Sequence, residues 1–351
     1  MFMRKKNSFS FILILALVLC AALNGCTGNS GNRGARQADT PGIVDAAGRR
    51  IAVRENAEEL TAASVYAVSV PFLEALDITS RVKAVNLKSS FWSLADPGLA
   101  AADTVGRGTV DLEKLAEIHP DVLIHRIHDE KTVEAVSKLG IDVICISVES
   151  VEDVKNTLSM LGEYFGEEEN AEKAIRWIDG MYKDIAKITD TIPESKRKTA
   201  LLMGGRTGRV AGADMLQSSM IRSAGGIPVV KETGDRNWVD IGVERIFEYD
   251  PDVIFLTGST AREYTVEELY DDPAWSALKA VRNRQIFVVP AETDSWDLPG
   301  LSCVIGTSYM LRKMYPGYLT QEELEDQVDS YYRFMFGRCF DRELKLDFDS
   351  Y

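Results

Sequence analysis

The chain has 351 residues, and its 40 Lys and Arg against 54 Asp and Glu give a formal net charge of −14. This acidic balance argues against nucleic-acid binding, which needs a basic face, although local basic loops could still hold an anionic ligand. The length exceeds what one hydrophobic core usually fills, so more than one lobe is expected.

The first 25 residues predict an export signal. Arg4, Lys5 and Lys6 precede an apolar run, 9–23, that is too short to span a membrane comfortably. Leu-Asn-Gly-Cys follows at 23–26, a lipoprotein cleavage pattern in which the asparagine is unusual. We expect a lipid on Cys26, at the extracellular face of the cell membrane or in the periplasm. An ordinary cleaved signal and an uncleaved anchor remain alternatives.

Residues 26–41 are rich in Gly, Asn and Ser and predict a flexible tether between the lipid and a globular body. The signal carries three basic and no acidic residues. Its removal leaves 40 − 3 = 37 basic residues against 54 acidic ones, a net charge of −17.

Residues 42–150 predict an N-terminal α/β lobe. The expected elements are a hairpin (43–53), a strand (62–68), a loop and short helix from Ser69, a strand (82–86), a long loop with Phe91 and Trp92, a strand (122–125), a helix (131–139) and a strand (142–146). Strands that alternate with helices indicate a parallel sheet covered by helices.

Residues 151–196 predict a helical linker. Apolar residues recur at helical spacing from Glu167 to about Asp190, with no proline and one glycine. Such a helix would be roughly 35 Å long, about one domain diameter. A single helix that spans two lobes is favoured over a helical hairpin within one lobe, because the strand pattern restarts only at Thr199.

Residues 197–351 predict a C-terminal α/β lobe with a closing helix. Its expected elements are a strand (199–203), a loop (204–208), a strand (253–257), a helix (266–270), a strand (285–289) and a helix that opens with a Thr320–Glu323 capping box and runs through Phe336.

One stretch occurs twice. LEKLAEIHPDVLI (112–124) and VERIFEYDPDVIF (243–255) align at a constant offset, 244 − 113 = 131 and 251 − 120 = 131. Each copy reads as an amphipathic helix, a Pro-Asp break and a buried strand. The repeat predicts two similar α/β lobes with a cleft between them.

Several segments resemble one family, the substrate-binding proteins of iron–siderophore, haem and cobalamin ABC importers. They are VDAAGRRI, GTVDLEKLAEIHPDVLI, LGIDVICI, SAGGIPVV, WVDIGVERIFEYDPDVIFL, DPAWSALKAVRNRQIFVVP and FMFG, spread over 43–337. The resemblance implies a class III periplasmic binding protein: two Rossmann-like lobes with central parallel sheets, joined by a single long helix. One departure is VPFLEALDI, where Pro71 and Asp77 replace the usual Glu and Gly.

The resemblance also implies a function. A lipid-anchored monomer would capture a metal chelate, foremost a ferric siderophore, and deliver it to the permease and ATPase of an ABC importer. Haem or cobalamin is the alternative ligand. Glu113 and Glu244 match the family's permease-docking glutamates, one on each lobe. No catalytic residue, cofactor or nucleic-acid partner is expected.

Ligand contacts are expected at the strand ends that face the cleft. The candidates are aromatic, basic and hydroxyl side chains: Tyr66, Ser69, Phe91, Trp92, Arg126, His128, Arg206, Arg209, Trp238, Ser259, Ser295 and Trp296. Aromatic rings beside arginines suit a planar or anionic chelate. Each of these side chains could instead be a core residue or a solvated surface residue without a role in binding.

Metal and enzyme chemistry are not indicated. The three histidines form no visible ligand cluster, although His128 or Tyr66 could serve as an axial ligand of a haem. Cys145 reads as a buried apolar residue, and a Cys303–Cys339 disulfide stays open. A chelatase-like enzyme would need a nucleophile with a base or a metal cluster, and a sensor would need a signalling domain.

Overall fold

The computed structural model describes residues 42–86, 96–235, 237–291 and 294–337. The predicted signal, Cys26, the tether, Phe91, Trp92 and Cys339 lie outside these ranges. Within them, no helix combines the length and apolar character that a membrane crossing requires.

The first sheet is wholly parallel, with strand order β5-β4-β3-β6-β7. Its strands are β3 (Ala62–Ser64), β4 (Val82–Val85), β5 (Asp103–Thr104), β6 (Val122–Arg126) and β7 (Asp142–Ile146). The other elements of this lobe are the antiparallel hairpin β1 (Gly42–Val44) and β2 (Arg50–Ala52), α1 (Val70–Ala75), α3 (Pro97–Ala101), α4 (Leu112–Ile118), α5 (Glu130–Ser137), and 3-10 turns at 57–59, 67–69 and 79–81. The βαβ prediction is confirmed.

The second sheet combines a parallel core with an antiparallel edge, in the order β11-β9-β8-β12-β13, and β10 also pairs with β8. Its strands are β8 (Thr199–Met203), β9 (Arg209–Ala211), β10 (Ile227–Pro228), β11 (Trp238–Asp240), β12 (Val253–Leu256) and β13 (Ile286–Val288). The other elements of this lobe are α8 (Leu216–Ser223), α9 (Gly242–Tyr249), α10 (Val266–Asp271), α11 (Lys279–Arg282), α12 (Cys303–Met314), α13 (Gln321–Phe336), and 3-10 turns at 194–196 and 275–277.

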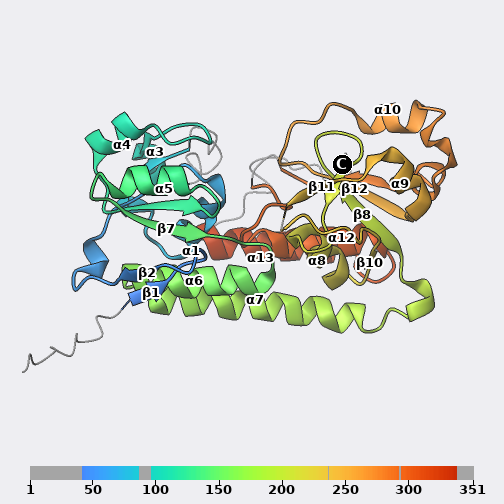
Figure 1. Ribbon diagram of the computed structural model, residues 1–351. Helices are drawn as coiled ribbons and strands as arrows, with labels where there is room; N and C mark the ends of the chain where they lie inside the picture. The colour runs from blue at the N-terminus through green and yellow to red at the C-terminus, as the bar shows by residue number, and fades with distance from the viewer. Residues whose placement is uncertain (1–41, 87–95, 236, 292–293, 338–351) are drawn as a thin grey trace, which may run out of the picture. The chain divides into compact units, whose positions relative to one another are not determined.

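A single long helix joins the two lobes. Helix α6 (Val151–Phe165) ends at Gly166 in the left-handed conformation, and α7 (Glu168–Thr189) begins two residues later. The two helices lie side by side (Figure 1). Helix α7 contacts α1 of the first lobe and both α8 and α12 of the second. The predicted spanning helix is therefore observed over nearly the predicted residues.

The repeated stretch folds the same way in both lobes. Helices α4 and α9 end on left-handed residues, His119 (φ 46°) and Asp250 (φ 40°), at the same offset of 250 − 119 = 131. Each left-handed residue ends its helix and is followed by the Pro-Asp pair that immediately precedes β6 or β12. Local backbone geometry thus follows the sequence repeat.

The aspartate of each Pro-Asp pair ties together two parallel strands. The Asp121 carboxylate accepts the amide and hydroxyl of Thr61 at 2.9 and 2.7 Å, and the Asp252 carboxylate accepts those of Thr199 at 2.9 Å each. Each threonine hydroxyl in turn accepts the amide of its aspartate. In both copies of the repeat, the aspartate therefore holds together the first residues of two paired strands, β3 with β6 and β8 with β12.

The strand expected over 62–68 is shorter than predicted. It ends at Ser64, whose hydroxyl accepts the Tyr66 amide at 3.1 Å, while the Ser69 hydroxyl donates to the Tyr66 carbonyl at 2.8 Å. These bonds turn the chain into a 3-10 turn and then α1, with Pro71 in its first turn. Tyr66 consequently leaves the strand at its carboxyl end.

Candidate functional site

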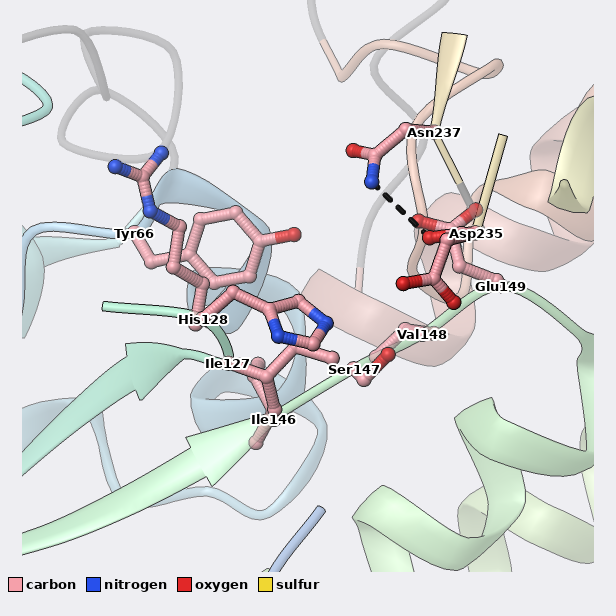
Figure 2. A pocket seen from close by; sticks show the side chains of 10 residues that line it. Tyr66, Ile127, His128, Ile146, Ser147, Val148, Glu149, Asp235 and Asn237 are labelled. Carbon is pink, nitrogen blue, oxygen red and sulfur yellow. Dashed lines mark hydrogen bonds between the residues drawn. The ribbon is translucent and has the colours of Figure 1, made fainter. Parts of the chain in front are cut away.

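A pocket of about 270 Å³ lies at the carboxyl ends of β3, β6 and β7. The loop before β11 in the second lobe completes its wall. Figure 2 shows the side chains that line it: Tyr66, Arg126, Ile127, His128, Ile146, Ser147, Val148, Glu149, Asp235 and Asn237. Ligands of open α/β sheets bind at this edge, so the pocket is the candidate binding site.

The end of β6 supplies the basic part of the wall. His128 takes a left-handed backbone (φ 64°) and Asp129 caps α5 by accepting the Thr132 amide. The Asp129 carboxylate also lies 3.0 Å from Nε2 of buried His125 and 3.9 Å from the guanidinium of half-exposed Arg126. His125 holds the pKa of Asp129 below its usual range, so Asp129 stays a carboxylate beneath Arg126.

The segment after β7 supplies Glu149, which links the two lobes. Oε2 of Glu149 accepts the amide of Leu216, the first residue of α8, at 3.3 Å. The Glu149 amide donates to the Asp153 carboxylate near the start of α6 at 3.1 Å. Glu149 therefore joins the pocket edge to the start of α6 through its amide and to the N-terminus of α8 through its carboxylate, where a negative charge is favourable.

Tyr66 is a neutral hydrogen-bonding group at this site. Burial raises the pKa of Tyr66 to about 12, the Glu149 carboxylate adds to the rise, and the Arg126 guanidinium opposes it. The phenol is therefore protonated at neutral pH, and it can donate to an acceptor oxygen of a ligand.

The loop before β11 faces these groups from the second lobe. Asp235 has a left-handed backbone (φ 53°), and the side-chain amide of Asn237 donates to the Asp235 carbonyl at 3.0 Å. Figure 2 shows Asp235, Asn237 and Glu149 together on one side of the pocket, with Tyr66 and His128 on the other.

The structure brings three of the predicted ligand residues together, Tyr66, Arg126 and His128. Two others lie in the core instead of at the pocket. Ser69 is buried, with its hydroxyl 2.6 Å from that of Ser64, and Trp296 is 1% exposed and packs edge-on against Tyr309. Each follows a strand, which predicts a place at the cleft, but both side chains are buried in the core.

The remaining candidates lie in the second lobe and are not among the residues that line this pocket. Arg206 and Arg209 pair with Asp240 at 2.8 and 3.8 Å, and Trp238 packs beside Gly204. The Ser259 hydroxyl bonds with Thr257, and the Ser295 carbonyl accepts the Ser302 hydroxyl. Trp92 lies outside the described residues. A role for these side chains in ligand binding stays a prediction.

The acidic half of the pocket, Glu149 and Asp235, was not predicted from the sequence. Arg126 and His128 were predicted because they lie at the end of β6, and Ser147 and Glu149 lie within three residues of the end of β7 and carry the same signal. Asp235 and Asn237 had no such signal, because they lie in an irregular loop before an antiparallel edge strand whose pairing with β9 is not visible in the sequence.

Neither a metal cluster nor a disulfide emerges from the described residues. No group of three or more His, Cys, Asp or Glu side chains is arranged there to hold a metal ion. Cys145 and Cys303 are buried free thiols.

Two buried acids beside the loop that follows β13 make stability depend on pH. Burial raises the pKa of Asp294 to about 7 and that of Asp297 to about 6. Asp294 accepts from the Tyr331 hydroxyl and Asp297 from that of Thr257, and neither forms an ion pair within the described residues. Both pKa values exceed the unfolded value of about 3.9, so the folded chain holds these protons longer.

The stability that these protons confer is therefore full below about pH 4 and lost as the pH rises through about 6 to about 7. We expect the unfolding free energy of the wild type, relative to Asp294→Asn and Asp297→Asn, to fall over this window. Urea unfolding of the three proteins across the window tests it. Differences that do not change with pH would contradict the assignment.

Residues 63–293, more than half the chain, match the periplasmic binding protein family. An uncharacterized ABC transporter substrate-binding lipoprotein of Bacillus subtilis, YvrC, is 21% identical over 324 residues, covering 90% of this chain and 98% of its own. The Fe(3+)-citrate-binding protein YfmC of the same organism is 22% identical over 307 residues, covering 83% and 91%.

A solved structure shares the fold. The molybdate-bound periplasmic binding protein MolA of Haemophilus influenzae superposes with a TM-score of 0.72 at 16% identity, covering 85% of this chain and 98% of its own. With two α/β lobes, a single joining helix and a pocket at the strand ends, the chain belongs to the periplasmic binding protein family. It is a solute-binding protein of the ABC-importer class and not an enzyme.

Proposed function

We propose that this protein captures a metal chelate, foremost a ferric siderophore, in the pocket that lies at the ends of β6 and β7 beside Asp235 and Asn237, and delivers it to an ABC importer. The observation that carries the proposal is the convergence of Tyr66, Arg126 and His128 from one lobe with Asp235 and Asn237 from the other. Donors on two lobes can hold one ligand between them, and the apolar floor of Ile and Val suits the body of a chelate.

The size of the pocket supports a compact ligand. Its volume of about 270 Å³ lies near the lower end of the roughly 300–1,000 Å³ of small-molecule sites. Haem and a corrinoid remain the alternative ligands. The relative YfmC, named for Fe(3+)-citrate binding, supports an iron chelate, and MolA supports a small oxoanion as a further candidate.

Delivery is proposed to involve Glu113 and Glu244. Each lies in the first turn of its helix, α4 or α9, at equivalent places of the repeat, and is exposed. Neither forms an ion pair with another described residue. Exposed carboxylates on two lobes can form bidentate pairs with permease arginines.

The anchoring and the lobe boundaries are also proposals. Cys26 would carry the lipid, residues 26–41 would tether the body, and the lobes would occupy 42–150 and 197–351 with the linker at 151–196. The relative YvrC, named a lipoprotein, supports the anchor.

Removing the pocket arginine tests the binding proposal. Arg126→Ala is expected to weaken chelate binding by about 1.5–3 kcal/mol, the value of a hydrogen bond to a charged group. Titration calorimetry with ferric chelates measures this loss. Arg176→Ala, on the exposed face of α7, is the control. Unchanged affinity in Arg126→Ala together with lost affinity in Arg206→Ala would move the site into the second lobe.

A further inference from the structure

Three side chains connect the core of the first lobe to the pocket. His125 on β6 is 1% exposed, and its Nε2 atom lies 3.0 Å from Oδ2 of Asp129. The same carboxylate oxygen lies 3.9 Å from the guanidinium of Arg126, which lines the pocket. Asp129 is therefore held by a buried group on one side and contacts a pocket group on the other.

The bond to Asp129 explains why a histidine is buried at position 125. This bond is the main reason that the pKa of Asp129 is below its usual range, so Asp129 is a carboxylate that can only accept. Nε2 of His125 must therefore carry the proton. Nδ1 is buried and has no hydrogen-bond partner among the residues that the structure describes. Because such an atom costs free energy, the use of this histidine lies in its bond to Asp129.

Helix capping does not require the histidine. Oδ1 of Asp129 caps α5 by accepting the Thr132 amide at 3.4 Å. Asp111 caps α4 in the same way by accepting the Lys114 amide at 3.0 Å, and within the described ranges no histidine bonds to it. The additional bond from His125 instead fixes Oδ2, the oxygen that faces Arg126.

Arg126 benefits from a fixed partner because its side chain is long and 55% exposed. Over the described part of the chain, Asp129 is its only ion-pair partner. A long side chain that moves freely in the unbound protein loses conformational entropy when a ligand orders it. A carboxylate that is already held in place reduces this loss, because it restricts the guanidinium before the ligand arrives.

We propose that Asp129 is a positioning residue, which His125 holds in place and which orients the Arg126 guanidinium for a ligand in the pocket. The assignment rests on the proposed function and adds two residues that do not line the pocket. The competing possibility has the opposite sign: a carboxylate beside Arg126 would compete with an anionic ligand for the guanidinium.

A double-mutant cycle separates positioning from a structural role. The probe is whichever of ferric citrate, a ferric trihydroxamate and a ferric triscatecholate binds the wild type most tightly in calorimetry. Asp129→Asn keeps a helix cap but presents an NH2 group to His125 and Arg126. We expect it to weaken binding about threefold to tenfold, the effect of ordering one long side chain. In an Arg126→Ala background the same change should alter affinity by less than about twofold.

Matched variants test the two ends of this arrangement. Asp111→Asn changes a cap of the same kind on α4 and should leave affinity unchanged. His125→Gln keeps a side-chain N–H group for Asp129, whereas His125→Leu keeps bulk and removes the donor. Only the leucine variant should bind the probe more weakly. Thermal unfolding of each variant confirms that it is folded at the temperature of the assay.

The outcomes separate this assignment from the function on which it rests. A loss in Asp129→Asn that disappears in the Arg126→Ala background supports positioning. A loss that persists in that background, or unchanged or tighter binding in Asp129→Asn, would overturn it and leave the pocket as the binding site. If Arg126→Ala alone had no effect, Arg126 would leave the site and Asp129 with it. Binding of none of the three chelates would overturn the proposed function as well.

Discussion

Replacing Glu113 and Glu244 together by alanine is expected to reduce ligand uptake by cells at least about tenfold, because the protein would lose one charged docking group on each lobe. Both side chains are exposed, so ligand affinity should not change and stability should stay within about 0.5 kcal/mol. Uptake of labelled chelate, with calorimetry on the purified variant, measures the two effects separately.

The repeat provides a matched control. Glu117 and Glu248 lie one helical turn later in α4 and α9 and are equally exposed. Glu248 pairs with Arg245 on the surface, a contact that contributes little to stability. Glu117→Ala with Glu248→Ala should leave uptake normal. Normal uptake in the Glu113 and Glu244 variant would refute docking, and lost affinity would place these residues in binding or folding instead.

The second large effect is expected at Gly306, near the start of α12. A Cβ atom on Gly306 would lie 2.0 Å from the carbonyl oxygen of Trp296 and 2.7 Å from Cε of Met220. The Trp296 carbonyl is main chain and cannot rotate away, so α12 or the loop beneath it must shift. We expect Gly306→Ala to destabilise the protein by about 3 kcal/mol, the upper range for overpacking.

Gly180 provides the opposite case. It lies on the exposed face of α7, and a Cβ atom there would have no neighbour within 4 Å. Gly180→Ala should therefore stabilise the protein by about 0.5–1 kcal/mol, because it lowers the entropy of the unfolded chain without strain. Chemical unfolding of the two variants measures both changes. A Gly306→Ala variant as stable as the wild type would mean that the approach of α12 to Trp296 is looser than the structure indicates.

The fold was predictable from sequence wherever a local signal existed. The long helix follows from uninterrupted helical spacing, and the final helix from a Thr320–Glu323 capping box that the structure contains. The two-lobed arrangement follows from the repeat, whose Pro-Asp aspartates tie parallel strands together in both lobes. These features depend on residues close in the chain or on a motif that occurs twice.

The site was only half predictable, for a physical reason. Arg126 and His128 follow a recognisable strand, so the strand-end rule applied. Ser69 and Trp296 also follow strands, but both side chains are buried in the core. The Ser69 hydroxyl bonds to that of Ser64, and Trp296 packs against Tyr309. The sequence pattern reveals neither contact. Asp235 reaches the pocket only through the fold of the second lobe. The acidic side of the pocket therefore required the structure.

The most direct test is a crystal structure of the mature protein purified from its host with its ligand retained. We expect a metal chelate in contact with Tyr66, Arg126 and Glu149 at the ends of β6 and β7. A ligand held instead by Arg206, Arg209 and Trp238, away from the ends of β6 and β7, would contradict the proposed site.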